Sequence, residues 1–276
     1  MSATFEPEAP QTLEGWFVLK EVYSVDWPKW RALDPETRDK AIASAEQWLD
    51  VAPSDRQGGS AVYSVLTQKG DLMFVHYRSS PDELNRVELS LRQLPLFEFL
   101  VPAGSFLSVI ELELDELAAI ARRKLTDQGI IPGAEQYDEF FETEMAKQKQ
   151  RLKDRLFPKI PNTRYICFYP MTRRRGGRVN WYTLAENERR ELMRGVGRIG
   201  HAYHEQVTQI VSGAIGLDDW EWGVSLYADD MLVFKKLLYE MRFDTASALY
   251  AEFGPVHVGI RVNMDQLGDL LTGYLT

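Results

Sequence analysis

The chain of 276 residues is poor in cysteine. Its single cysteine, Cys167, excludes a disulfide framework within one chain, so the fold depends on packing rather than on covalent cross-links. Cys167 lies in the apolar run 165–169, Tyr-Ile-Cys-Phe-Tyr. A buried thiol is expected there rather than a nucleophile.

Positive charge and long apolar runs are also scarce. The chain has 32 Lys and Arg against 41 Asp and Glu, a formal net charge of -9, which argues against a nucleic-acid partner. No apolar run approaches the roughly 18 to 20 residues that a membrane span needs. The first ten residues have neither the basic nor the apolar segment of a secretory signal. We therefore expect a soluble cytoplasmic protein.

Apolar and aromatic residues are plentiful. A hydrophobic content of 45%, with 12% aromatics, is enough for one large core or two smaller ones, and it restricts disorder to the chain ends. Alternating and helical patterns predict the order β-α-β-β-α-β in the first half. The expected elements are a strand at 13–25, a helix from about 34 to 51, strands at 61–66 and 71–77, a helix opening at 80–83 and a strand at 106–112.

The second half repeats this order without repeating the sequence. The expected elements are a strand at 164–169, a helix at 185–203, strands at 206–212 and 222–226, a helix at 231–241 and a strand at 256–262. A charged, helical connector at 115–154, broken at 129–133, separates the halves. Each half leaves one sheet face bare, so the two halves are expected to cover each other in an α+β, barrel-like arrangement.

A basic loop follows the strand at 164–169. It holds four arginines within six positions, Arg173, Arg174, Arg175 and Arg178, in a chain that is acidic overall. Guanidinium groups bind carboxylates in a bidentate manner, so a small polyanionic ligand would suit this loop. An exposed turn with solvated arginines is the alternative that the charge pattern alone leaves open.

The residues around this loop resemble the coproheme decarboxylase branch of the chlorite dismutase family. The resemblance begins at 165–182, Tyr-Ile-Cys-Phe-Tyr-Pro-Met-Thr-Arg-Arg-Arg-Gly-Gly-Arg-Val-Asn-Trp-Tyr, and covers nearly the whole chain except the connector at 115–150. Further matching segments are Leu-Glu-Gly-Trp at 13–16, Lys-Gly-Asp-Leu at 69–72, and the stretches 209–223, 234–244 and 247–254.

The resemblance implies an α+β subunit of two ferredoxin-like β-α-β-β-α-β halves that form a dimeric α+β barrel within one chain. The implied units are an N-terminal half at 1–114, a helical connector at 115–160 and a C-terminal half at 161–276 that carries a porphyrin site. Members of the branch are usually homopentamers. The implied reaction uses hydrogen peroxide to turn two propionates of coproheme into vinyl groups with loss of carbon dioxide, which yields protohaem.

Site residues follow from the same resemblance. Tyr169 matches the tyrosine that forms a radical beside a propionate, and Arg173 matches a lysine next to the reactive propionate. Gln209 matches the polar residue on the distal side of the iron. The remaining matches, which hold propionates by side chain or backbone, are Arg155, Met171, Arg242 and Ser247. Tyr169 could instead be a core aromatic, and Arg242 could pair with Glu240 or Asp244 on its own helix.

The family's axial histidine is missing from the matching position, which holds Val196. Valine cannot ligate iron. His201 and His204 are about 140° and 80° round the helix from Val196, so neither takes the same place, and His201 is only a weak candidate ligand. His76 and His257 lie on predicted strands, where core or surface positions are expected.

Two kinds of function remain open from the sequence. The first is a coproheme-decarboxylating, haem-dependent oxidoreductase, and the second is a non-catalytic porphyrin-binding or haem-free relative that lost its axial ligand. A chlorite-degrading enzyme is a weaker reading, because that chemistry depends on a histidine-ligated iron and a distal arginine, where this chain has Val196 and Gln209. A scaffold without a ligand would be insensitive to changes at Arg242 or Tyr169.

Overall fold

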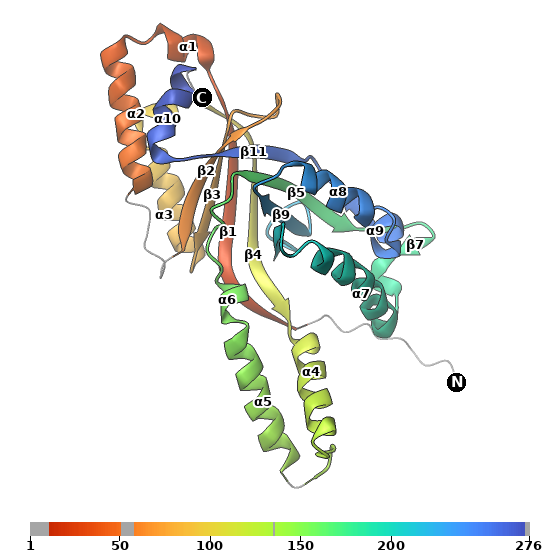
Figure 1. The fold of residues 1–276 in the computed structure, drawn as a ribbon. Helices are drawn as coiled ribbons and strands as arrows, with labels where there is room; N and C mark the ends of the chain where they lie inside the picture. The colour runs from red at the N-terminus through yellow and green to blue at the C-terminus, as the bar shows by residue number, and fades with distance from the viewer. Residues whose placement is uncertain (1–10, 51–57, 135, 274–276) are drawn as a thin grey trace.

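One antiparallel sheet runs through both halves of the chain and closes on itself as a barrel (Figure 1). The computed structural model describes residues 11–50, 58–134 and 136–273. The strand order is β10-β5-β11-β2-β3-β1-β4-β8-β9, and a further pairing of β5 with β9 completes the ring. The strands are β1 (Thr12–Val25), β2 (Gly59–Val65), β3 (Leu72–Arg78), β4 (Leu100–Glu113), β5 (Tyr165–Arg173), β8 (Thr208–Gly213), β9 (Trp222–Ala228), β10 (Ala251–Phe253) and β11 (His257–Val262).

The expected β-α-β-β-α-β order is confirmed in both halves. The predicted meeting of two sheets takes the form of a single closed sheet, because β11 pairs with β2 and β4 pairs with β8 across the boundary between the halves. These seams satisfy backbone groups that two separate sheets would leave unpaired at their edges. Val51, the predicted end of the first helix, lies outside the described residues.

Helices cover the outside of the barrel and one helical hairpin projects from it (Figure 1). The N-terminal half carries α1 (Trp27–Ala32), α2 (Pro35–Asp50), α3 (Pro81–Leu91), η1 (Pro95–Phe99) and, from the chain's end, α10 (Met264–Thr272). The connector forms α4 (Leu114–Asp127), α5 (Tyr137–Arg151) and α6 (Lys153–Leu156). The C-terminal half carries η2 (Trp181–Thr183), α7 (Glu186–Ala202), α8 (Leu232–Met241) and α9 (Thr245–Tyr250). None of the described helices is long and apolar enough to cross a membrane.

Several short elements were not predicted from the sequence. They are α1, α9, α10, the three-residue strand β10, and a two-stranded hairpin of β6 (Arg175–Gly176) and β7 (Val179–Asn180) inside the basic loop. Strand β4 also begins at Leu100, six residues before the predicted start at 106. Segments this short carry too few residues for a periodic pattern, so tertiary contacts decide their conformation.

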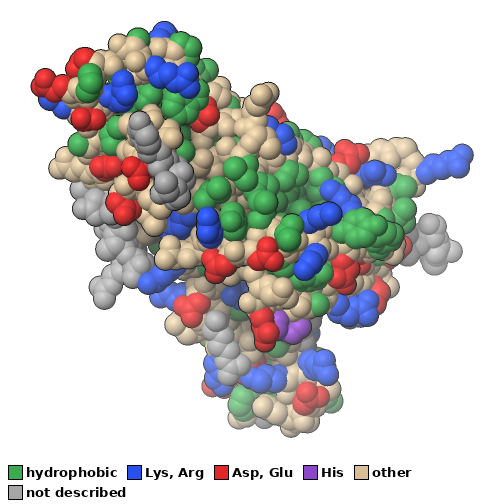
Figure 2. All heavy atoms as spheres, turned by 45° about the horizontal axis from the view of Figure 1, so that its top comes forward, with side chains coloured by type: hydrophobic (Ala, Val, Ile, Leu, Met, Phe, Trp, Pro, Cys, Tyr) green, Lys and Arg blue, Asp and Glu red, His purple; other side chains and the backbone are tan. Residues whose placement is uncertain are grey.

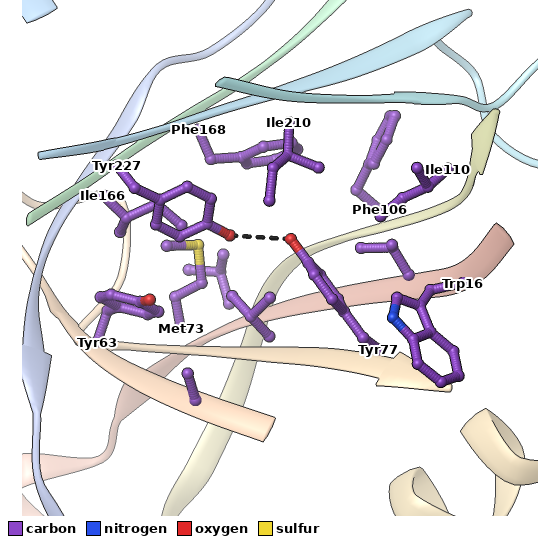
Figure 3. Close-up of a cluster of buried hydrophobic side chains, with 14 of the residues drawn as sticks. Trp16, Tyr63, Met73, Tyr77, Phe106, Ile110, Ile166, Phe168, Ile210 and Tyr227 are labelled. Carbon is purple, nitrogen blue, oxygen red and sulfur yellow. Dashed lines mark hydrogen bonds between the residues drawn. The ribbon is translucent and has the colours of Figure 1, made fainter. Parts of the chain in front are cut away.

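The barrel interior is packed with side chains from both halves (Figure 3). Trp16, Tyr77 and Phe106 from the first half meet Phe168 and Tyr227 from the second. The hydroxyls of Tyr77 and Tyr227 lie 3.1 Å apart and form a hydrogen bond. The inside of the barrel is therefore a filled core, and any ligand site must lie on the outer face of the sheet.

One amine is buried inside this core. Lys20 is 1% exposed, and its Nζ atom lies 4.5 Å from the ring centre of Phe168 and 5.9 Å from that of Phe106. Burial lowers the pKa of Lys20 from 10.5 to about 7. Without a carboxylate among these contacts, the charged form is poorly stabilised.

Candidate functional site

The two halves correspond strand by strand, which allows their outer faces to be compared. In the first half His76 lies opposite Leu19 and Ser60, and in the second half Leu226 lies opposite Cys167 and Gln209. By the same register, Glu21 takes the place that Tyr169 has in the second half. The first half thus places polar Glu21 and His76 where the second half has Tyr169 and Leu226, although the rest of its outer face is apolar and buried beneath its helices.

The helices over these faces differ in burial. Helix α2 buries Ala41, Ile42 and Ala45, but none of the described residues of α7 is buried. Met193 of α7 is 41% exposed and Val211, on the outer face of β8, is 47% exposed. Helix α7 therefore leaves apolar surface uncovered on both helix and sheet, which is suited to a flat apolar ligand.

Apolar surface extends beyond α7 in this half. Leu232, Tyr239 and Phe243, on or next to α8, are all at least 60% exposed. On the face of the molecule in Figure 2, hydrophobic side chains gather in the centre with Lys and Arg side chains beside them. Such contiguous apolar surface is uncommon on a monomer and is typical of binding regions.

Val196 is partly buried on α7, on the helix face that has contacts with the sheet. Its neighbours on the same helix face are Met193 and Gly200, three residues before and four residues after it. Met193 contacts Arg173 of β5, and the carbonyl of Gly200 accepts a hydrogen bond from Gln209 Nε2 at 3.2 Å. A Cβ atom on Gly200 would lie 3.1 Å from that nitrogen, so glycine permits the close approach of helix and strand.

Arg173 is the buried cation of this region. It is 8% exposed, and its guanidinium lies over the ring of Trp181 at 4.3 Å. Its side-chain donors reach the carbonyl of Ala246 at 3.5 Å and the sulfur of Met193 at 3.1 Å. These are a long contact and a weak acceptor, so the guanidinium has spare hydrogen-bonding capacity. Burial lowers the pKa of Arg173, although nearby Tyr182 and the Glu221 carboxylate oppose this effect.

Glu221 holds the backbone at the same point. It is 6% exposed, and its Oε2 atom accepts a hydrogen bond from the backbone N–H of Arg173 at 2.7 Å. Its Oε1 atom lies 3.6 Å from Nε of Arg175. Burial raises the pKa of Tyr182, and the adjacent Glu221 carboxylate adds to that rise. One carboxylate thus joins the end of β5 to the basic loop.

Tyr169 lies nearby on the outer face of β5. It is 6% exposed and packs against Phe253, with ring centres 5.8 Å apart. The guanidinium of Arg242 stacks on the other ring of this pair, 3.7 Å from the centre of Phe253. Burial raises the pKa of Tyr169, and Arg242 opposes this only in part. The phenol therefore keeps its proton at neutral pH.

The other predicted residues have mixed positions. Met171, on β5, is partly buried in the same apolar cluster as Tyr169, and Ser247, on α9, is 7% exposed. Arg155 is exposed on α6, which packs against β1 and β4 of the first half, so the described contacts do not join it to the others. Of the four loop arginines only Arg173 is buried, and Arg174, Arg175 and Arg178 are exposed.

The four histidines have different surroundings. His257, on β11, stacks on Phe168 with ring centres 6.3 Å apart, and burial lowers its pKa. His201 and His204 are exposed and stack on each other with ring centres 4.6 Å apart. His76 is buried under the helices of the first half, where burial and Arg78 lower its pKa to about 3. In the described part of the chain, no group of three or more His, Cys, Asp or Glu side chains is placed to hold a metal ion.

Sequence reasoning missed four residues of this region: Trp181, Met193, Glu221 and Phe253. Trp181, Glu221 and Phe253 do stand in the stretches that carry the family resemblance, but as context rather than as site residues. An acidic residue between Trp220 and Trp222 was the available signal, because a carboxylate in such an apolar setting needs a partner. That partner, Arg173, is 48 positions away and is identified only by the fold.

Comparison with known proteins gives consistent matches. A family model described as chlorite dismutase matches residues 38–262. A solved structure described as a novel heme-binding protein from Thermus thermophilus is 36% identical, with 97% of this chain and 99% of that chain covered and a TM-score of 0.82. A putative chlorite dismutase matches at 17% identity and a TM-score of 0.64, covering 96% of this chain and 100% of that one. A variant of the chlorite dismutase from Candidatus Nitrospira defluvii matches at 16% identity and a TM-score of 0.68, covering 95% and 96%.

Proposed function

Because the chain belongs to the chlorite dismutase family, we propose that its C-terminal half binds an iron porphyrin and that the protein converts coproheme to protohaem with hydrogen peroxide. The 36% identical relative described as heme-binding supports the ligand class. The residues shared with the coproheme decarboxylase branch support the reaction. From the same resemblance, the protein is proposed to act as a homopentamer.

The main support for this proposal is the burial of the Arg173 guanidinium without a hydrogen bond to a carboxylate. The guanidinium is 8% exposed, and its side-chain hydrogen bonds go to a carbonyl at 3.5 Å and a thioether rather than to a carboxylate, so burial has removed most of its water without an equal replacement. An incoming carboxylate would restore charge-assisted hydrogen bonds worth about 1.5–3 kcal/mol each. Propionate groups on the edge of a porphyrin are carboxylates of this kind.

The uncovered apolar surface fits the rest of such a ligand. Val196 and Met193 on α7 would face one side of the macrocycle, and Val211 on β8 the other. Burying these side chains would contribute about 25 cal/mol per Å² of apolar surface removed from water. The exposed apolar side chains and Arg173 support a macrocycle with an acidic edge, while the matching axial position holds Val196, which cannot ligate iron, and His201 at the end of α7 stays a weak candidate. When bound, the iron porphyrin supplies oxidation by peroxide, with a reactivity that depends on its axial ligation.

Tyr169 would act on a propionate beside it. Its raised pKa keeps the phenol neutral, so it can give up a hydrogen atom and afterwards take one from the propionate side chain. Arg173 would hold that carboxylate in place. Arg242, Met171 and Ser247 would bind the remaining propionates, and the resemblance adds Arg155, which lies on α6 apart from this group. Gln209 would supply the distal polar group once its bond to the Gly200 carbonyl is released.

Titration of the purified protein tests this proposal. Coproheme and protohaem are added separately while the Soret band is followed, then peroxide is added and the porphyrin products are identified by mass. We expect coproheme to bind and to lose two carboxyl groups. The substitution Arg173→Gln should weaken coproheme binding by about tenfold or more, whereas Arg178→Gln, in the exposed turn of the same loop, should not. Binding without any product would mean a porphyrin carrier instead, and no binding would overturn the site.

A further inference from the structure

Glu221 is the acidic group nearest to the buried cation, yet it does not bind the cation's side chain. Its Oε2 atom accepts from the backbone N–H of Arg173 at 2.7 Å, and its Oε1 atom faces Nε of Arg175 at 3.6 Å. The guanidinium of Arg173 points instead to Met193 of α7 and Ala246 of α9. The carboxylate is thus occupied by the backbone and by the neighbouring arginine.

The backbone of Glu221 is fixed as well. Its N–H donates to the carbonyl of Met171 at 3.1 Å, and its carbonyl accepts from the N–H of Ala214 at 2.7 Å. These bonds anchor the backbone of Glu221 to β5 and to the residue after β8, so its carboxylate starts from a fixed point beside Arg173. Arg174, which follows Arg173, begins the turn into the hairpin of β6 and β7. Its N–H donates a hydrogen bond to the carbonyl of Tyr250. Glu221 therefore holds the backbone at the end of β5, where the basic loop begins.

We infer that Glu221 is a positioning residue that sets the backbone of Arg173 so that its guanidinium meets a ligand carboxylate. This inference rests on the proposed porphyrin site. Arg173 contributes to binding only where a ligand carboxylate reaches it. Glu221, which positions Arg173, is therefore inferred to favour the porphyrin with more carboxylates. A porphyrin with four carboxylates depends on this geometry more than one with two.

Whether replacement of Glu221 raises or lowers the affinity for an anion distinguishes a positioning role from a purely electrostatic one. Removal of a negative charge beside Arg173 and Arg175 would, by charge alone, strengthen the binding of an anion. Loss of the acceptor for the Arg173 N–H would instead free the end of β5 and weaken the binding of the anion. Glu221→Gln removes the charge but keeps a carbonyl acceptor, and Glu221→Leu removes both. Glu252→Leu is the matched control, since Glu252 forms an exposed pair with Arg174 at 3.5 Å on the same loop.

The experiment uses the full chain and metal-free coproporphyrin and protoporphyrin, whose binding is followed by absorbance without any turnover. We expect Glu221→Leu to lose about tenfold in affinity for the four-carboxylate porphyrin and less than about threefold for the two-carboxylate one. Glu221→Gln and Glu252→Leu should remain within about threefold of the natural protein for both. Equal or tighter binding of coproporphyrin by Glu221→Leu would overturn the inference.

Hydrogen exchange in the ligand-free protein gives a second, independent measurement. Amides of residues 171–176 should exchange faster in Glu221→Leu than in Glu221→Gln or the natural protein. If the natural protein binds neither porphyrin while this exchange pattern holds, the proposed function fails and the positioning of Arg173 stands. Unchanged exchange in Glu221→Leu would refute the positioning role whatever the ligand.

Discussion

At the scale of single residues, a substitution at Tyr169 can test porphyrin binding and the reaction separately. Its phenol is buried beside Phe253, and the ring rather than the hydroxyl makes the described packing contact. Tyr169→Phe keeps the ring, so we expect porphyrin affinity within about threefold of the natural protein, whereas decarboxylation should fall by about 100-fold or more. Mass analysis of porphyrins after addition of peroxide measures this. Unimpaired product formation would remove Tyr169 from the reaction.

Lys20 gives a prediction about stability. The pKa of the folded state is about 7 and that of the free side chain is 10.5, so between these values the unfolded chain binds a proton that the folded chain does not. The free energy of unfolding should therefore fall as pH drops from 10.5 towards 7, by about 1 kcal/mol per pH unit. Lys20→Met should be more stable at pH 7 by on the order of 2 kcal/mol and should lack this slope.

Urea unfolding at pH 7 and at about pH 9 checks the prediction. Lys40→Met is the control, because Lys40 is an exposed partner of Glu36 on α2 and its loss should leave the pH dependence unchanged. A slope that persists in Lys20→Met would show that another group is responsible.

Sequence reasoning reached Arg173 and Tyr169 because they stand in a distinctive motif. It could not show that Arg173 turns inward while Arg174, Arg175 and Arg178 face solvent, since one chemical type occupies all four positions. The sheet register and the contact with Met193 decide between them, and both join segments far apart in the chain. For the same reason Glu221 was seen as context and not as a partner.

At the scale of elements, helix α7 offers a direct test of the axial position. Val196 lies between Met193 and Gly200 on the helix face that has contacts with the sheet, so Val196→His would place an imidazole in the uncovered region. We expect tighter binding of iron porphyrin, by about tenfold or more, and a shifted Soret band, with no gain for metal-free porphyrin. Arg198→His, on the opposite side of the helix, is the control. Equal gains from both substitutions would place the ligand elsewhere.

Long elements were predictable and short ones were not. Helix α7 was expected at 185–203 and is found at Glu186–Ala202, because seventeen residues carry a clear helical pattern. Helix α9 has six residues and is held by the side chain of Asp244, whose Oδ1 atom accepts from the N–H of Ala246 at 2.9 Å. Its importance lies in the Ala246 carbonyl that contacts Arg173, which no local pattern indicates.

At the scale of the whole molecule, the shared barrel core predicts that neither half folds alone. Trp16 and Tyr77 pack in one cluster with Phe168 and Tyr227, and seams at β2–β11 and β4–β8 complete the sheet. We expect fragments 1–114 and 161–276 to lack a cooperative thermal transition separately, while the intact chain unfolds in a single step. Calorimetry of the three proteins tests this.

Shortening the projecting hairpin is the matched control. Helices α4 and α5 have a small core of their own, with Ala121 and Met145 buried between them. Replacement of residues 118–147 by a short Gly-Ser turn should therefore preserve the single transition of the barrel. A cooperative transition in either isolated half would mean that the barrel is not one folding unit.

The duplicated element order was enough to predict an α+β, barrel-like arrangement of two sheets with helices outside. The closure of the sheet was not, because the seams depend on which strand edges meet and not on the pattern within any strand. The family resemblance predicts a site in the second half. The physical difference between the halves, a filled outer face beneath α2 and an uncovered one beneath α7, depends on burial and required the structure.

The seam between β4 and β8 is short. In the described sheet these strands are in register at Val109↔Gly213 and Ile110↔Ser212, with a side-chain bond of 2.8 Å between Ser108 and Ser212, whereas β8 and β9 are paired over six positions. The uncovered Val211 lies on the same strand. Local opening of the sheet should thus be most frequent at this seam, beside the proposed porphyrin site. A bound porphyrin should make this local opening rarer.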